Sequence, residues 1–335
     1  MTPEEVSAAL RDFLLRSHGA RNVIVENVRL LTGGASRQTW SFDATIDQGK
    51  TLPLILRADP RKGPNVMSRS VEYRVLEAAG NAGVPVPRVH LMGDDSLGVP
   101  FFLMERIEGE TIARRILRDE EYAAAREVMT AQLGTILAGI HRTPLTDDLR
   151  ETLQSPESGK TAAETEVARF EQTYRMITPE PHPAFELAFQ WLRRNLPPPS
   201  EDTLVHGDYR MGNLIVGPEG IRSILDWELA HIGDPLEDFG FLCVRSWRFG
   251  NDHLPVAGVG QREELFRAYE AAGGRHVDPN AVHWWEVFGN LRWGIICIMQ
   301  ASAYLTGMSK SVELATIGRR TAETEWELLN LMETN

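Results

Sequence analysis

The amino-acid sequence predicts an α+β protein, in which a strand-rich N-terminal part precedes a larger, mostly helical part. Apolar and β-branched residues alternate in short segments near the N-terminus, at 22–31, 38–46, 51–58, 88–92 and 99–104. Beyond residue 109 apolar residues recur at helical spacing, at 120–141, 161–174, 183–196, 262–272 and 280–332. Short strands near 204–205, 214–216 and 224–225 interrupt the helices. This order of elements indicates one large domain or two lobes.

Composition narrows the class of protein further. The 335 residues are 42% hydrophobic and 24% charged, which is typical of a soluble globular protein. A net charge of −12 argues against nucleic-acid binding, which needs a basic face. The longest apolar stretch, Trp293 to Leu305, is too short to span a membrane and predicts a buried helix.

We expect a cytoplasmic protein, because no basic start followed by an apolar run marks a signal peptide. Cys243 and Cys297 lie in apolar surroundings, so two buried thiols are expected rather than a disulfide.

The first helix has a clear start signal. Thr2 is the expected N-cap, Pro3 stands in the first turn, and Glu5 completes a capping box. Val6, Leu10, Phe13 and Leu14 form its apolar stripe.

A glycine pair separates the first two predicted strands. Gly33, Gly34 and Ser36 could bring backbone amides and a hydroxyl close to a phosphate group. A Gly-Gly hairpin turn would have the same sequence, so both interpretations stay open.

The third strand ends at a cation, and a helix follows at about 65–82. Arg57 lies where a kinase places the residue that grips the α- and β-phosphates, and Glu72 of the helix could pair with it. A surface arginine and an unrelated helix glutamate are the alternative.

A polar segment with glycine follows the strand at 99–104 and suggests a hinge between two lobes. Met104, Glu105 and Ile107 would offer backbone groups to an adenine there. We expect an N-terminal lobe at 1–107 and a C-terminal lobe at 108–335, with a helical insertion at about 145–200. An ordinary strand-to-helix turn would have a similar sequence.

The stretch 204–228 carries the strongest chemical signal. His206, Asp208 and Asn213 fill the pattern H-x-D-x-x-x-x-N, and Asp226 follows the next hairpin. Such a loop supplies an Asp for the accepting hydroxyl and an Asn for Mg²⁺, while a second Asp holds Mg²⁺ against the phosphates. A hairpin with solvated acidic turns explains one carboxylate but not the whole set.

Several neighbouring residues have structural interpretations as well. Asp234 is expected to cap the helix that begins at Pro235, while Asp238 could hold the catalytic loop in place. His141 ends a long helix, where the helix dipole favours it.

The polar segment 146–160 is expected to be a mobile connection. The aromatic residues of the last helical region are expected to be mostly core, with one or two lining a substrate pocket: Trp284, Trp285, Trp293 and Tyr304.

Taken together, these motifs resemble the aminoglycoside phosphotransferase (APH) family of small-molecule kinases. The resemblance rests on LTGGASRQTW, LILRADP with Glu72, LMERIEG, LVHGDYRMGN and ILDWELAHIGDPLEDFG, and it is closest to the branch associated with acyl-CoA dehydrogenases. It implies a two-lobed protein-kinase-like fold, with an antiparallel sheet and a helix in the first lobe, ATP in the cleft and Mg²⁺ at the site.

The resemblance also implies roles for individual residues. Asp208 would be the catalytic Asp, with His206 and Asn213 in the same loop. Asn213 and Asp226 would hold the metal, and Glu228 could contact a second metal or its water. Arg57 stands where many antibiotic kinases resembling this family carry Lys, which favours the dehydrogenase-associated branch.

Three functions are compatible with the sequence. The favoured one is an ATP-dependent kinase of a small-molecule hydroxyl, on a hydroxy acid or a hydroxyacyl thioester. The others are an aminoglycoside or other antibiotic kinase and a nucleotide-binding pseudokinase that serves as a scaffold. The intact set of Asp208, Asn213 and Asp226 argues against the scaffold.

Overall fold

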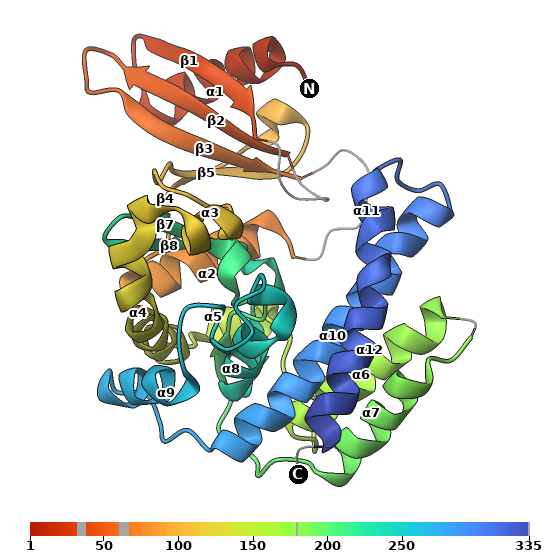
Figure 1. Cartoon of the computed structure of the whole chain (residues 1–335). Helices are drawn as coiled ribbons and strands as arrows, with labels where there is room; N and C mark the ends of the chain where they lie inside the picture. Colours follow the sequence, from red (N-terminus) through yellow and green to blue (C-terminus); the bar gives the residue numbers. More distant parts are fainter. Residues whose placement is uncertain (32–37, 60–66, 179, 334–335) are drawn as a thin grey trace.

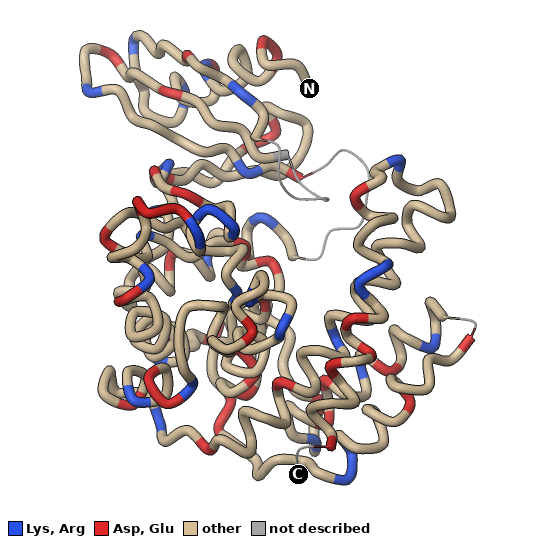
Figure 2. Tube along the Cα trace, in the orientation of Figure 1, with Lys and Arg blue, Asp and Glu red and all other residues tan. Residues whose placement is uncertain are grey.

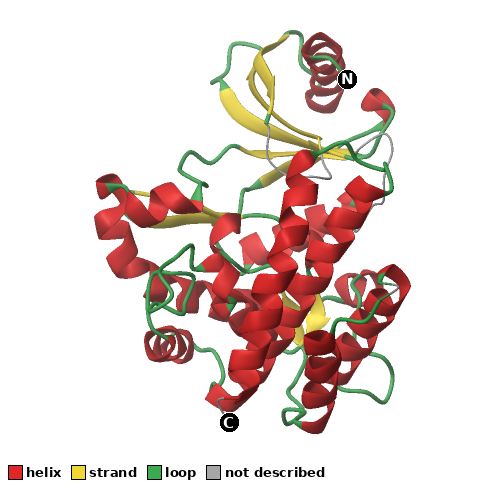
Figure 3. Cartoon of the chain, turned by 45° about the vertical axis from the view of Figure 1, so that its right-hand side comes forward, coloured by secondary structure: helices red, strands yellow, loops and turns green. Residues whose placement is uncertain are grey.

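An antiparallel sheet forms the N-terminal part of the molecule, and helices form most of the rest (Figures 1 and 3). The computed structural model describes residues 1–335 except 32–37, 60–66, 179 and 334–335. The five sheet strands are ordered β1-β2-β3-β5-β4, and all neighbours are antiparallel. Their bounds are β1 Val23–Leu30, β2 Gln38–Ile46, β3 Leu52–Ala58, β4 Val89–Met92 and β5 Phe101–Glu105.

Two helices cover the two faces of this sheet. Helix α1 (Pro3–His18) has the predicted capping box on Thr2, and its buried stripe packs on Leu54 and Leu56 of β3. Ile55, between them, packs with Val75 of α2 (Arg69–Asn81). This alternation follows from the two-residue period of a strand.

Two large hydrophobic cores fill the described C-terminal part, and the first also includes residues of β3, α2 and β5. The first gathers α4 (Ala123–His141), the strands around the predicted catalytic loop, α8 (Leu236–Cys243) and α9 (Arg262–Ala271). The second gathers α6 (Ala162–Ile177), α7 (Pro183–Arg194), α10 (Pro279–Leu305) and α12 (Thr321–Glu333). The remaining helices are α3 (Ala113–Arg118), α5 (Asp147–Thr152) and α11 (Val312–Ile317).

Two short hairpin-like sheets position the predicted catalytic loop. β6 (Thr203–Val205) pairs with β9 (His231–Gly233), and β7 (Leu214–Gly217) pairs with β8 (Gly220–Ile224). Both pairs are antiparallel, so residues 206–213 and 225–230 leave these sheets as adjacent loops. The β9 strand was not predicted, because a strand of three residues shows too little periodicity in the sequence.

The structure corrects several expectations. The segment 146–160 is not wholly irregular, because Thr146 caps helix α5 within it. Trp293 to Leu305 is buried only in its first part, since Leu305 is 79% exposed at the end of α10. Tyr304 is likewise exposed, whereas Trp284 and Trp285 lie in the core.

The cysteines match the sequence analysis. Cys243 and Cys297 are free and buried, and burial raises the pKa of each thiol to about 12. Basic and acidic residues are interspersed along both parts of the chain (Figure 2). Among the described residues, no helix has the length and apolar character needed to cross a lipid bilayer.

Candidate functional site

The predicted catalytic loop begins where β6 ends. The Asn213 side-chain nitrogen donates to the backbone carbonyl of Asp208 at 2.8 Å and to its carboxylate Oδ2 at 2.6 Å. The other carboxylate oxygen, Oδ1, accepts from Arg210 Nε at 2.9 Å. Two donors therefore hold the Asp208 carboxylate in one orientation.

His206 joins this loop to the loop that carries Asp226. Its Nδ1 accepts the backbone N–H of Asp208 at 3.1 Å, so the proton is on Nε2, which donates to the Leu225 carbonyl at 3.0 Å. Burial lowers the pKa of the imidazole, which favours this neutral form. Because the backbone engages both ring nitrogens, His206 positions the loops in this structure.

Asp238 of α8 holds the same loop from the protein interior. Its carboxylate accepts the backbone N–H groups of His206 and Gly207, each at 2.9 Å, and lies 3.2 Å from His141 Nε2. Burial alone would raise the pKa of Asp238, but the hydrogen bond and charge of His141 hold it below its ordinary value. His141, interpreted from sequence as a helix-end residue, thus belongs to this network.

Arg292 of α10 holds the carbonyl side of the loop. Its Nη2 donates to the Gly207 carbonyl at 2.6 Å, and its Nη1 pairs with Glu237 Oε1 at 2.7 Å. Gly207 has φ +75°, and a side chain there would collide with the Leu229 carbonyl. The sequence analysis missed Arg292, because 85 residues separate it from Gly207.

Asp226 meets the sheet of the N-terminal part through Arg57. Arg57 Nη1 lies 3.1 Å from Asp226 Oδ1, and its Nη2 lies 2.7 Å from Glu72 Oε1. Burial alone would lower the pKa of Arg57, but the charges of Glu72 and Asp226 outweigh the effect of burial and raise this pKa. The predicted contact between Arg57 and Glu72 is thus present.

A second arginine, missed in the sequence analysis, reinforces this pair. Arg69, in the first turn of α2, is buried, contacts Glu72, and lies 2.8 Å from Asp59. Its position three residues before Glu72 is the one sequence signal that could have identified it.

The two loops are also joined through their backbones. The Leu225 N–H donates to the Asn213 carbonyl at 2.8 Å, which brings Asp226 beside the loop of Asp208. Asp226 has φ +61°, an uncommon conformation for a residue with a side chain. Glu228 follows in a short 3₁₀ turn, and its charge contributes to the raised pKa of Arg57.

The predicted nucleotide residues fall into two groups. Gly33, Gly34 and Ser36 lie outside the described residues. Met104 is buried at the end of β5, and Glu105 and Ile107 are half-buried beyond it. Two backbone bonds anchor this segment, from Glu105 N–H to Arg88 and from Arg106 N–H to Pro53.

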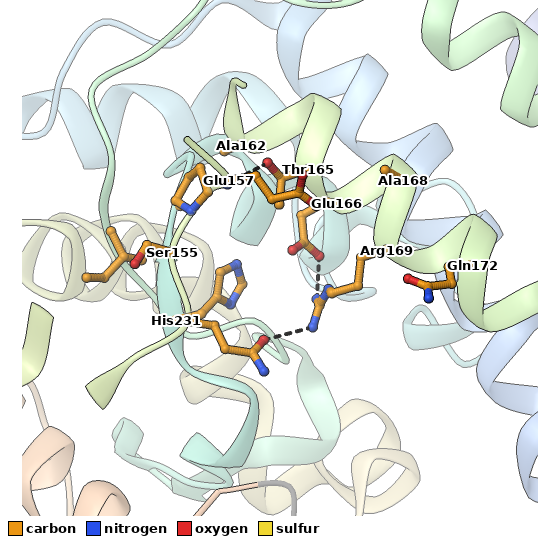
Figure 4. Close-up of a pocket in the computed structure, with 13 residues that line it drawn as sticks. Ser155, Glu157, Ala162, Thr165, Glu166, Ala168, Arg169, Gln172 and His231 are labelled. Atoms are coloured by element: carbon orange, nitrogen blue, oxygen red, sulfur yellow. Dashed lines mark hydrogen bonds and ion pairs between the residues drawn. The ribbon is translucent and has the colours of Figure 1, made fainter. Parts of the chain in front are cut away.

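A cluster of other ionisable groups lies behind the catalytic loop. Glu166, His231 and Glu237 are buried, with ligand-type atoms within 4.8 Å of one another. Glu166 pairs with Arg169 on the wall of an open pocket of about 320 Å³ that His231 also lines (Figure 4). Burial disfavours a charged His231, but Glu237 at 3.2 Å outweighs it and raises the pKa to about 9. The ring's other nitrogen contacts the Leu229 carbonyl at 2.9 Å, so the cluster forms an ion-pair network around an imidazolium.

Comparison with protein families gives one match that covers most of the chain. Residues 27–278 match the model of the APH family, described as a phosphotransferase enzyme family. This range includes Arg57, Glu72, the catalytic loop and Asp226. It agrees with the resemblance found from the motifs.

Curated relatives share part of their length with this chain. Acyl-CoA dehydrogenase family member 10 of Mus musculus is 33% identical over 232 residues, which cover 64% of this chain and 21% of that protein. Acyl-CoA dehydrogenase family member 11 of Homo sapiens is 27% identical over 337 residues, covering 90% and 42%. The chain therefore spans less than half the length of these relatives.

Solved structures confirm the predicted two-lobed kinase-like fold. A crystal structure of a Ralstonia eutropha protein, provisionally assigned as an aminoglycoside phosphotransferase, superimposes on this chain with a TM-score of 0.71 at 22% identity. The match covers 99% of this chain and 98% of that one. The aminoglycoside phosphotransferase APH(4)-Ia, in a ternary complex with AMP-PNP and hygromycin B, gives 0.59 at 16% identity, covering 97% and 98%.

Proposed function

The chain belongs to the APH phosphotransferase enzyme family, and from this premise we propose that it is an ATP- and Mg²⁺-dependent small-molecule kinase. It would transfer the γ-phosphoryl group of ATP to a hydroxyl group of its acceptor. The observation that carries this proposal is the convergence of Asp208, Asn213 and Asp226 on two joined loops, with Arg57 reaching Asp226 from the sheet.

Asp208 has the role of the catalytic carboxylate. It accepts a hydrogen bond from the acceptor hydroxyl, aligns that oxygen with the γ-phosphorus, and takes the proton late, because the transition state is loose. Asn213 and Arg210 support this role by fixing both carboxylate oxygens. This orientation contributes much of the rate of phosphoryl transfer, because a small displacement of a reacting group lowers the rate strongly.

Asn213 and Asp226 fit a divalent cation. Since the Asn213 nitrogen donates to Asp208, the group that Asn213 offers a metal is its carbonyl oxygen. Asp226 adds a carboxylate that is 45% exposed, and oxygen ligands of this kind suit Mg²⁺. Bound Mg²⁺ would neutralise charge on the β- and γ-phosphates. Glu228 would contact a second metal or its water.

The N-terminal lobe, proposed at 1–107, would bind the nucleotide. Arg57, held by Glu72, would grip the α- and β-phosphates, and Gly33, Gly34 and Ser36 would cradle them. The backbone of Met104, Glu105 and Ile107 would contact the adenine. The C-terminal lobe, 108–335, would bind the acceptor, with the helical insertion at about 145–200.

We favour a hydroxy acid or a hydroxyacyl thioester as the acceptor. Similarity to two acyl-CoA dehydrogenase family members supports this class. An antibiotic kinase is the second candidate, supported by the fold likeness to the complex with hygromycin B. A pseudokinase scaffold is disfavoured, because it would not need Asp208, Asn213 and Asp226 together.

The test is ADP release with Mg·ATP across hydroxy acids, their coenzyme A thioesters, aminoglycosides and macrolides. We expect a rise above basal hydrolysis with one acyl class. The Asp208→Asn variant should lose this rise by about 10²- to 10⁴-fold, because it removes the proton acceptor, while nucleotide affinity persists. A variant that loses nucleotide binding as well would indicate a structural role for Asp208. A rise with aminoglycosides alone would select the antibiotic kinase.

A further inference from the structure

We propose that Arg210 binds an acyl oxygen of the acceptor, a carboxylate or a thioester carbonyl, while Asp208 binds the hydroxyl to be phosphorylated. The inference rests on the proposed kinase function and names the group that would select its substrate. Arg210 lies two residues after Asp208 and contacts it directly, at 2.9 Å from Nε to Oδ1. A ligand on Asp208 therefore meets this guanidinium.

The Arg210 guanidinium has N–H donors that the contact with Asp208 does not use. An arginine carries five N–H groups, and the contact with Asp208 uses the one on Nε. Among the residues that the structure describes, no hydrogen bond reaches either Nη nitrogen of Arg210. Its side chain is 25% exposed, so a ligand can reach part of it.

Aromatic stacking fixes the plane of this group. The guanidinium carbon lies 4.7 Å from the ring centroid of Trp247, and Trp247 lies 4.8 Å from Trp293. Such a cation–π contact orients the guanidinium before a ligand arrives. Gly212 leaves the space that one Nη group occupies, since a side chain there would collide with it. Binding therefore requires little reordering of Arg210.

The other cations on this side already have carboxylate partners. Arg245 and Arg320 line an open pocket of about 310 Å³ beyond the two tryptophans. Arg245 lies 2.6 Å from Asp252, and Arg320 lies 3.2 Å from Glu323. Within the described part of the chain, the carboxylate contact of Arg210 uses Nε alone, which leaves donors beside Asp208 for a ligand.

These positions set the chemistry of the ligand. The Nε and Nη groups of one guanidinium are bonded to the same carbon, so an acyl oxygen on Nη lies close to a hydroxyl on Asp208. At ordinary hydrogen-bond lengths, roughly one to three carbon atoms can separate the two groups. A planar fork suits acyl oxygens, whereas a polycationic amino sugar would meet a like charge beside the catalytic carboxylate.

The experiment compares hydroxy acids with alcohols that lack the acyl group. The acceptors are 3- and 4-hydroxy acids of four to ten carbons, their coenzyme A thioesters, and the matching secondary alkanols. The variants are Arg210→Met, which keeps the stem but removes the donors, and Arg210→Lys, which keeps one point charge. Arg16→Met, at an exposed arginine of α1, is the matched control.

We expect wild type and Arg16→Met to prefer an acyl acceptor over its alkanol in kcat/KM. Because Arg210 also orients Asp208, Arg210→Met should lower kcat for both acceptors, and it should lower kcat/KM for the acyl acceptor by about 10- to 100-fold more than for the alkanol, mainly through KM. Arg210→Lys should restore part of the loss with the acid. If Arg210 only orients Asp208, kcat/KM falls by the same factor for the acyl acceptor and the alkanol, and the inference is overturned. Comparison of the acids with their coenzyme A thioesters shows whether Arg210 binds a carboxylate oxygen or a thioester carbonyl.

A second measurement separates this inference from the proposed function. Quenching of tryptophan fluorescence reports binding of the same compounds without nucleotide, because Trp247 contacts Arg210. Acid or thioester binding that Arg210→Met weakens would uphold the inference even if no compound were phosphorylated. Phosphorylation without any acyl preference would keep the kinase and overturn the inference. The absence of both binding and turnover would overturn both.

Discussion

At the scale of single residues, the site combines contacts that are close in the sequence with contacts that are remote. Asp208, Arg210 and Asn213 lie within six positions, and their loop brings their side chains together. Motif spacing could predict this group. The partners that hold the loop come from other helices, and the sequence analysis missed Arg292 because nothing near it marks a function.

Asp226 gives a direct test of the metal assignment. We expect Asp226→Ala to remove the gain in AMP-PNP affinity that Mg²⁺ provides, a loss of about 10- to 100-fold, because a charged ligand of the cation is lost. Titration with AMP-PNP in Mg²⁺ and in EDTA measures this difference.

Glu219→Ala is the control for that titration, since Glu219 is an acidic residue of the turn between β7 and β8 and pairs with Arg222. An Asp226→Ala protein whose affinity still rises with Mg²⁺ would remove Asp226 from the metal site. Arg57 would then be its main partner, through the contact at 3.1 Å.

At the scale of elements, the sequence predicted what local pattern determines. The capping box of α1, the alternation in β3 and the long amphipathic helices follow from residues within a few positions of one another. Strand β9 and helix α5 were missed or taken as irregular, because three to six residues carry too little periodicity. The exposed end of α10 was misjudged, because apolar composition does not tell which neighbours cover a helix.

Helix α8 supports the catalytic loop through Asp238, and this support can be tested. Asp238→Asn replaces one acceptor oxygen by an N–H₂ group, so one of three donors would face another donor. We expect kcat to fall on the order of 100-fold, since the loop shifts, and unfolding free energy to fall by about 1 to 3 kcal/mol. Steady-state kinetics and denaturant titration measure the two effects.

The matched control lies just before the same helix. The N-cap of α8 is Pro235, so Asp234 does not cap the helix as expected. Its Oδ1 accepts the Leu236 N–H at 2.9 Å, and an Asn side chain keeps an oxygen that can accept the same bond. Asp234→Asn should therefore change both quantities little. If Asp238→Asn kept wild-type kcat, α8 would not control the geometry of the loop.

At the scale of the whole molecule, one ion-pair network joins the helical insertion to the catalytic loop. It runs from Glu166 of α6 through His231 and Glu237 to Arg292, which binds the Gly207 carbonyl. Its members come from α6, β9, α8 and α10, and α6 and α10 are distant in sequence from the neighbouring β9 and α8. Packing of the second core brings α6 and α10 together, so no local pattern could have predicted the whole network.

The raised pKa of His231 makes this network dependent on pH. A folded pKa of about 9 against about 6.5 in the unfolded chain means that folding favours the protonated ring. The resulting stability is fully present below about pH 6.5 and is lost as pH rises through about 9. From a shift of this size we expect up to about 3 kcal/mol of pH-dependent stability.

The measurement is the unfolding free energy of wild type and His231→Gln between pH 6 and pH 10. The substitution should lower the unfolding free energy most at pH 6. The difference in unfolding free energy between the two proteins should shrink toward pH 10, because the wild-type ring then loses its proton. Other groups that face the ring, Glu166 and Asp202, are unchanged in the variant. His253→Gln, at an exposed histidine, is the control. A difference that stays constant across this range would mean that His231 is neutral in the folded protein, and Glu237 would then depend on Arg292 for its charge partner.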